Sequence, residues 1–144
     1  MNVLDSPADP KRIRALKIFL ITTLAVGAVG SVAARPLPVM IAHWVIASWA
    51  LAPLWTLSYG LMAVAAWLVW KRAGLHSPAL AVFAAQLLLN LIWRIWPVPA
   101  LAVMMDLCVL ATLALFARRS LNGALTFLPC AIWDLSVSLP IFGL

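Results

Sequence analysis

The length of its apolar segments is the feature that most constrains this chain. Five stretches with almost no charge lie at 16–34, 51–70, 78–95, 98–116 and 124–142. A helix needs about 20 apolar residues to cross about 30 Å of hydrocarbon, and each stretch approaches that length. Helices are expected because a segment in lipid must satisfy its own backbone hydrogen bonds. We therefore predict an all-α fold, a single five-helix membrane bundle over residues 1–144 with a flexible segment at 1–12.

The composition excludes a soluble or disordered chain. Hydrophobic residues make up 66% of the sequence and charged residues 10%, whereas a soluble domain carries about 25% charged residues. A disordered chain would be poor in apolar residues. Cys108 and Cys130 both lie inside apolar stretches, so we interpret them as small core residues and expect no disulfide and no metal site.

The first apolar stretch has two interpretations. Basic residues at 11–14 and the small residues at 31–34 resemble the charged region and cleavage site of a secretory signal peptide. The apolar run from 18 to 34 is longer than the about 7–15 residues of a signal core. This length favours a retained helix, with a cleaved signal peptide as the alternative.

The basic residues predict an orientation. Eight of the ten fall on one predicted side of the membrane. Four precede the first apolar stretch or lie near its start (Lys11, Arg12, Arg14 and Lys17), two follow the second stretch (Lys71 and Arg72), and two follow the fourth (Arg118 and Arg119). Only Arg35 and Arg94 fall on the other side. Because cytoplasmic loops are rich in Lys and Arg, we expect a cytoplasmic N-terminus. The net charge of +6 then reflects topology, and no nucleic-acid partner is expected.

Aromatic and polar side chains recur at positions i, i+4 and i+7 on three predicted helices, which places each set on one helix face. The sets are Trp55, Tyr59 and Met62; Gln86, Asn90 and Trp93; and Pro129, Trp133 and Ser136. Polar groups in a membrane normally face the bundle interior, so the three faces indicate a pocket for a large flat hydrophobic ligand. The alternatives are core packing for the aromatic rings and interhelical hydrogen bonds for the amides.

The other tryptophans lie near helix ends or in the long first connection. Trp67, Trp70 and Trp96 are placed as expected for an interfacial aromatic belt. Trp44 and Trp49 lie in the apolar connection at 35–50. We expect this connection to cover the mouth of the bundle.

Three charged residues inside or beside the apolar stretches have open roles. Arg94 and Asp106 could form an ion pair across the third and fourth helices, or Arg94 could extend to the interface. Asp134, in the fifth stretch, could be protonated, linked to water, or paired with a ligand or Arg94, since an isolated buried carboxylate is costly.

Small residues allow helices to approach closely. Ala81 and Ala85 are four residues apart on the third predicted helix, and Gly27 and Gly30 thin the first. Such spacings are typical of helix contacts in membranes and predict a dimer interface.

Several of these residues resemble, in order, the motifs of a known family. Trp55 to Met62 resembles W-T-x-x-Y-x-x-M, Ala85 to Trp93 resembles A-Q-L-x-x-N-x-x-W, and Pro129 to Trp133 resembles P-Y-x-x-W, with Asp106 between the last two. The family is that of the bacterial tryptophan-rich sensory proteins and the mitochondrial translocator protein (TspO/MBR).

The resemblance implies a homodimer of five-helix bundles that binds porphyrins, haem-like tetrapyrroles, sterols or synthetic flat ligands. The ligand-binding positions that it implies are Trp44, Trp49, Trp55, Tyr59, Gln86, Asn90, Trp93 and Trp133, and the dimer positions are Ala81 and Ala85. We expect no metal, no catalytic residue and no required cofactor, with porphyrin or haem as a possible ligand. Because some family members resembling this chain degrade protoporphyrin in light with the tryptophans at positions 55 and 133, a photochemical activity is conceivable.

The sequence departs from the family pattern at three places. The first connection keeps Trp44 and Trp49 but lacks the two prolines that lie between them in the family, and Cys130 replaces a tyrosine. The C-terminal sterol motif is missing, so sterol binding is not carried over. These departures bear on the shape of the lid and on the choice of ligand.

We therefore expect a multi-pass receptor or sensor of a bacterial cell membrane that binds a tetrapyrrole between its helices. The alternatives are a light-dependent porphyrin-degrading enzyme, a transporter of hydrophobic ligands, and a structural membrane subunit with a degenerate pocket.

Overall fold

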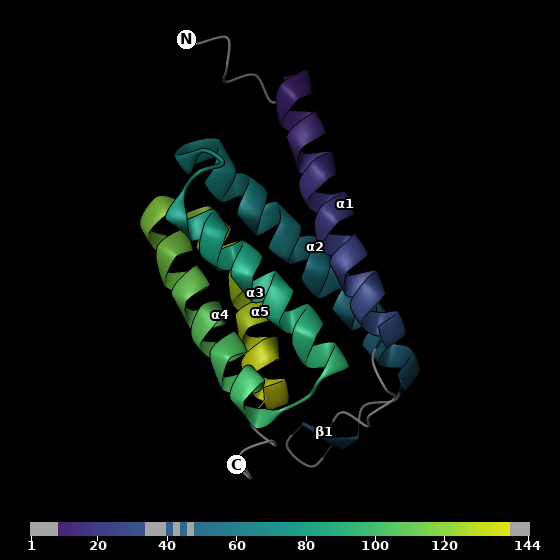
Figure 1. The fold of residues 1–144 in the computed structure, drawn as a ribbon. Coiled ribbons are helices and arrows are strands. Elements are labelled where there is room, and N and C mark those ends of the chain that lie inside the picture. Colours follow the sequence, from purple (N-terminus) through teal and green to yellow (C-terminus); the bar gives the residue numbers. More distant parts are fainter. Residues whose placement is uncertain (1–8, 34–39, 42–43, 46–47, 139–144) are drawn as a thin grey trace.

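The computed structural model describes residues 9–33, 40–41, 44–45 and 48–138 and is helical over most of them (Figure 1). The helices are α1 (Pro10–Ala33), α2 (Ser48–Ala73), α3 (Pro78–Ile95), α4 (Pro99–Arg119) and α5 (Leu121–Ser138). A short antiparallel pair, β1 (Met40–Ile41) and β2 (Trp44–Val45), lies in the first connection, with Ile41 opposite Trp44. The predicted all-α bundle is confirmed, and α3 has the predicted bounds.

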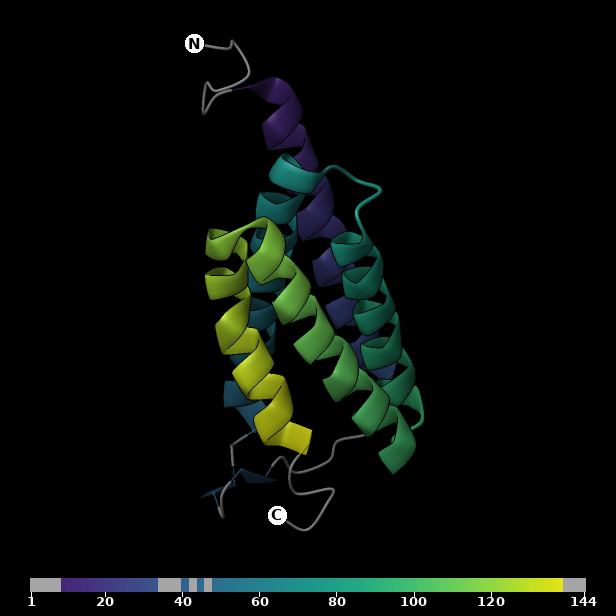
Figure 2. The same ribbon diagram turned by 90° about the vertical axis from the view of Figure 1, so that its left-hand side faces the viewer.

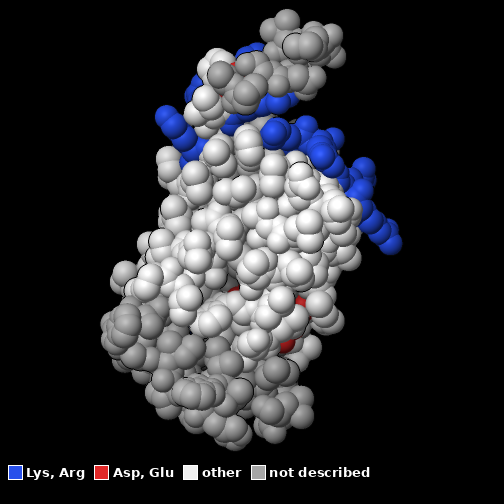
Figure 3. Space-filling model, turned by 180° about the vertical axis from the view of Figure 1, so that it is seen from behind, with Lys and Arg blue, Asp and Glu red and all other residues white. Residues whose placement is uncertain are grey.

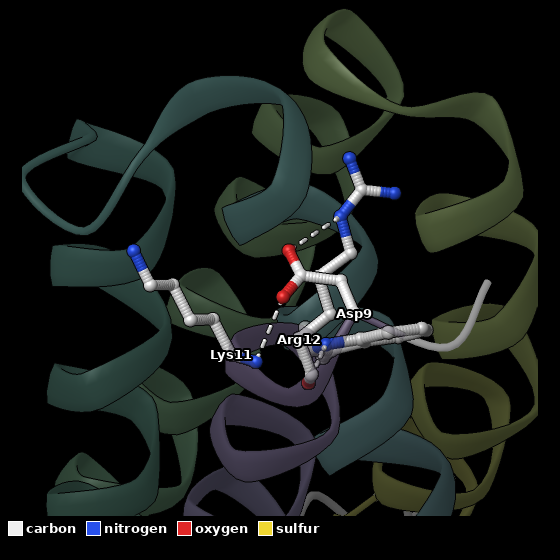
Figure 4. Close-up of polar contacts among 4 residues, drawn as sticks. Asp9, Lys11 and Arg12 are labelled. Atoms are coloured by element: carbon white, nitrogen blue, oxygen red, sulfur yellow. Dashed lines mark hydrogen bonds and ion pairs between the residues drawn. The ribbon is translucent and has the colours of Figure 1, made fainter. Parts of the chain in front are cut away.

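The first helix begins earlier than predicted, because the sequence carries a capping signal at Asp9-Pro10. The Asp9 carboxylate accepts a hydrogen bond from the Lys11 backbone N–H at 2.9 Å (Figure 4). Proline at the first helical position loses no hydrogen bond and has a helical φ, and an aspartate before it caps the helix. Residues 10–12 are therefore part of α1, residues 1–8 lie outside the described part, and the flexibility of the segment 1–12 stays a prediction.

A hydrogen bond also joins the start of α1 to the C-terminal part of α2. The Trp67 indole Nε1 donates to the backbone carbonyl of Arg12 at 3.1 Å, and the Lys71 ammonium lies 4.4 Å from the centre of the Trp67 ring. Trp67 was predicted to lie in an interfacial belt. Its position beside these basic residues at the end of a helix is compatible with that belt, which stays a prediction.

The five helices form a ring rather than a series of hairpins (Figure 2). Around the ring the order is α1, α2, α5, α4 and α3, and α3 contacts α1 to close it. Few contacts join α2 directly to α3, although a short loop connects them. Side chains from α2, α3 and α5 can therefore meet across a common interior.

Four of the described helices are long and apolar enough to cross a membrane: Pro10–Val32, Ala52–Ala73, Pro78–Ile95 and Pro99–Arg119. The fifth helix, α5, carries Asn122 and a buried Asp134, which lower its mean hydropathy. Its predicted continuation over residues 139–142 lies outside the described residues. Large apolar side chains such as Ile21, Leu107 and Ile132 are more than half exposed, as expected for a surface in contact with lipid.

The two ends of the bundle differ in charge. One end, called the basic end below, contains the start of α1, the α2–α3 loop and the α4–α5 turn. On the face seen in Figure 3, Lys and Arg side chains form a band across this end, called the basic collar below. The opposite end, called the distal end, contains the α3–α4 turn and the β1–β2 pair (Figure 1). The eight basic residues assigned to one side from the sequence all lie within helices at the basic end, in the first turns of α1 or in the last turns of α2 and α4.

The interior towards the basic end is filled by three phenylalanines from different helices. Phe116 of α4 lies 5.8 Å from Phe83 of α3 and 5.5 Å from Phe127 of α5, between ring centres. All three side chains are buried. Buried charged and amide side chains of the described interior, in contrast, lie in the middle and the distal half of the bundle.

Close packing of α5 on α2 depends on Gly123. A Cβ atom at Gly123 would lie 3.0 Å from Val69 Cγ2 and 3.2 Å from the backbone oxygen of Ala65. Gly123→Ala should lower the free energy of unfolding by about 1–3 kcal/mol, since overpacking forces neighbouring atoms to move. Unfolding in detergent micelles, followed by circular dichroism, measures the change.

The matched control is Gly60→Ala, because no described atom lies within 4 Å of a Cβ atom at Gly60. That variant should be neutral or more stable by about 0.5–1 kcal/mol, since alanine favours a helix interior. Equal stability of the Gly123 variant and the native protein would contradict the packing assignment.

Candidate ligand-binding site

Three aromatic side chains meet in the distal half of the interior. Trp55 of α2 and Trp133 of α5 are in edge-to-face contact, with ring centres 5.8 Å apart and planes at 86°. Tyr59, one turn after Trp55, has its ring centre 6.3 Å from that of Trp55. The helical spacing predicted from the sequence thus places Trp55 and Tyr59 together, and the ring order of the helices adds Trp133.

A buried hydrogen bond joins α2 to α3 at this level. The Tyr59 hydroxyl donates to Asn90 Oδ1 at 2.9 Å, and both side chains are no more than 3% exposed. Asn90 therefore makes the interhelical contact considered from the sequence. It does so with a residue that was itself predicted to line the site.

The position of the Tyr59 ring depends on a glycine in α1. A Cβ atom at Gly27 would lie 2.6 Å from Tyr59 Cδ2, closer than any side chain tolerates. Gly27 lets α1 approach the ring directly, so the close helix approach predicted for this glycine occurs within one protomer.

Arg94 was not predicted as a site residue, yet it belongs to the aromatic group. Its guanidinium carbon lies 4.2 Å from the centre of the Trp55 ring, a geometry that favours a cation–π interaction. The ion pair with Asp106 considered from the sequence is absent among the described residues, and Asp106 Oδ2 instead accepts a hydrogen bond from the Ser138 hydroxyl at 2.8 Å. The sequence indicated only the helix face, because Arg94 follows Gln86 and Asn90 at intervals of four residues; the contact with Trp55 depends on the order of the helices.

Asp134 brings a carboxylate into the same region. Its side chain is 2% exposed, and it interacts electrostatically with Asp106 and with Arg94. Its Oδ2 atom has no hydrogen-bond partner among the described residues. One cation near two carboxylates leaves Asp134 only partly compensated.

Buried polar atoms without a partner in the described part of the chain are concentrated in this half of the bundle. They include Gln86 Nε2 and Oε1, Trp93 Nε1, Arg94 Nε, Asp106 Oδ1, Trp133 Nε1 and Asp134 Oδ2. Each such atom costs free energy in an apolar surrounding unless water or a ligand pairs with it. We define the interior cluster as Trp55, Tyr59, Gln86, Asn90, Trp93, Arg94, Trp133 and Asp134. This cluster supplies ring faces, donors and acceptors together.

The remaining predicted site residues differ in what the structure describes of them. Gln86 is completely buried and Trp93 is half-buried, both on α3. Trp44 belongs to β2 and Trp49 to α2, but their side chains lie outside the described part. Their role as a lid stays a prediction.

The small residues predicted to form a dimer interface are exposed. Ala81 and Ala85 lie on α3 with their side chains outward, and Leu88, one turn beyond Ala85 on this side of the helix, is 58% exposed. A second copy could reach them. The dimer stays a prediction.

A double-mutant cycle tests the hydrogen bond that organises the cluster. Tyr59→Phe and Asn90→Leu, alone and combined, should reveal a coupling energy of about 0.6–1.7 kcal/mol, the range of interhelical hydrogen bonds in membranes. Unfolding in detergent micelles provides the four stabilities.

Pairing Tyr59→Phe with Asn122→Leu, at an exposed residue of α5, provides the control. That pair should be additive within about 0.3–0.5 kcal/mol, as expected for distant sites. A coupling energy of zero between positions 59 and 90 would show that the Tyr59–Asn90 hydrogen bond does not stabilise the bundle.

Comparison with known proteins places the chain in a family. The family model described as "TspO/MBR family" matches residues 18–139. Neither the curated proteins nor the solved structures that were compared include a match. The matched range covers the described parts of α2 to α5 and most of α1, and with them the whole interior cluster.

Proposed function

The chain belongs to the TspO/MBR family of membrane proteins, whose general role is sensing or ligand binding, and on that basis we propose that its ligand is a tetrapyrrole. The interior cluster is the proposed site. One observation carries the proposal: buried donors and acceptors without partners among the described residues lie in the same half of the bundle as a group of aromatic rings in mutual contact.

The aromatic rings favour a large flat ligand. Trp55 and Trp133 lie edge to face, so a planar ring system could stack on one indole while touching the edge of the other. Stacked or edge-to-face aromatic contacts contribute about 0.5–1.5 kcal/mol each beyond the burial of apolar area. A porphyrin offers the area to use both rings.

The polar atoms favour a ligand with acidic side chains. The indole Nε1 atoms of Trp93 and Trp133 and the Nε atom of Arg94 are buried donors without partners among the described residues. Charge-assisted hydrogen bonds from a guanidinium to a carboxylate are about twice as strong as neutral ones. A tetrapyrrole propionate would satisfy these donors.

Titration with protoporphyrin IX in the dark tests this assignment. Binding should be saturable, as followed by quenching of tryptophan fluorescence and by a shift of the porphyrin absorption band. Replacing both Trp55 and Trp133 by Phe should weaken binding about tenfold, equivalent to about 1.4 kcal/mol.

Trp96→Phe provides the control, since Trp96 lies in the α3–α4 turn and is 68% exposed. It should bind like the native protein. An absence of saturable binding, or equal affinity in the double variant, would refute the proposal.

We further propose that the basic end faces the cytoplasm, in accordance with the positive-inside rule. A fluorescent reporter fused before Met1 should then be active in bacterial cells, and an exported enzymatic reporter fused after Leu144 should be active outside the cytoplasm. The reverse pattern at Leu144 would contradict the orientation.

A further inference from the structure

A groove lies between α1 and α3 on the basic half of the bundle, away from the interior cluster. Its volume is about 740 Å³, within the about 300–1,000 Å³ that is typical of small-molecule sites. The walls are almost entirely apolar and include Ile18 and Phe19 of α1, Trp70 of α2, and Leu80 and Leu87 of α3. No residue of the interior cluster lines it.

The length of the groove along α3 matches the hydrocarbon thickness of one leaflet of a bilayer. On α3 its lining runs from Ser77 to Leu87, which corresponds to about 15 Å along a helix. The hydrocarbon core of a bilayer is about 30 Å thick. A groove of this depth that starts at the basic end therefore suits an acyl chain from the leaflet on that side.

Basic residues lie near the mouth of the groove. His76 lines the groove, and Arg72 lies four residues before His76, in the last turn of α2. On α1, Arg14 precedes Ile18 by one helical turn on the same face. Arg14, Arg72 and His76 are all exposed and belong to the end of the bundle with the basic collar (Figure 3).

The start of α3 adds to this potential. Ser77 caps the helix, with its hydroxyl oxygen accepting from the Leu80 backbone N–H at 3.4 Å, and Pro78 is the first helical residue. The N-terminus of a helix carries a partial positive charge. It lies beside His76, at the mouth of the groove.

From these features we infer that the α1–α3 groove binds an anionic phospholipid. One acyl chain lies between Ile18 and Leu80, and the phosphate lies near Arg14 and Arg72. An acyl chain gains little by leaving other lipid tails for an apolar groove, so selectivity comes from the headgroup charge. Binding should therefore favour anionic over zwitterionic lipids that have the same chains.

Native mass spectrometry of the detergent-solubilised full chain tests this inference. The probes are phosphatidylglycerol and phosphatidylcholine with identical acyl chains. Phosphatidylglycerol should be retained preferentially as a single adduct. Arg14→Gln with Arg72→Gln should reduce its affinity about 30-fold, since each basic residue contributes about fivefold, or about 1 kcal/mol.

The matched control is Arg118→Gln with Arg119→Gln, which removes the same charge from exposed positions at the end of α4. This variant should retain phosphatidylglycerol like the native chain. Equal losses in the two variants would show diffuse surface attraction and would overturn the site.

A second pair of variants tests the position of the acyl chain. Ala84→Phe fills the groove that Ala84 lines and should abolish the selective adduct, whereas Ala111→Phe, at an exposed residue of α4, should not. Unchanged adducts in Ala84→Phe would refute the inference. Loss of a dimer in Ala84→Phe, with lipid binding intact, would assign the groove to a second copy of the chain and would also refute it.

Discussion

Hydrocarbon offers no hydrogen-bond partners, so every polar group within this bundle depends on a partner inside the protein. The constraint explains the division of the interior. Towards the basic end, three phenylalanines pack together and need no partner. Towards the distal end, the carboxylates, amides and indoles exceed the partners that the described residues supply. A bundle selected for stability alone would have placed apolar side chains there, and this excess of polar groups is why we propose the ligand site in the distal half.

The geometry of that half depends on close approach between helices. Gly27 lets α1 press against the Tyr59 ring, and the fixed ring directs its hydroxyl to Asn90. One turn earlier on α2, Trp55 lies between Trp133 and the Arg94 guanidinium. These contacts connect four of the five described helices through a few side chains. A shift of α1 or α5 would therefore change the positions of the aromatic rings.

Much of this arrangement was predictable from the sequence. The apolar stretches predicted the helices, because their length is set by the bilayer, and the i, i+4, i+7 spacing predicted which side chains would share a face. The order of the helices around the ring was not predictable, since short loops suggest that α2 packs on α3, whereas few contacts join them.

The role of Arg94 was missed for a related reason. A single basic residue near a helix end has several favourable positions, and only the ring order brings Trp55 of α2 beneath it. The start of α1 was missed because hydropathy gives no weight to Asp9-Pro10, although this pair caps the helix. The basic collar, in contrast, followed directly from counting charges along the sequence.

The most direct test of the central claim compares protoporphyrin IX with its dimethyl ester, on the native chain and on Arg94→Met. If Arg94 pairs with a ligand carboxylate inside the cluster, esterification and the substitution should each weaken binding about tenfold, equivalent to about 1.4 kcal/mol, and the two losses should not add. Equal affinity of the native chain for the acid and the ester would contradict the proposed pairing of Arg94 with a ligand carboxylate.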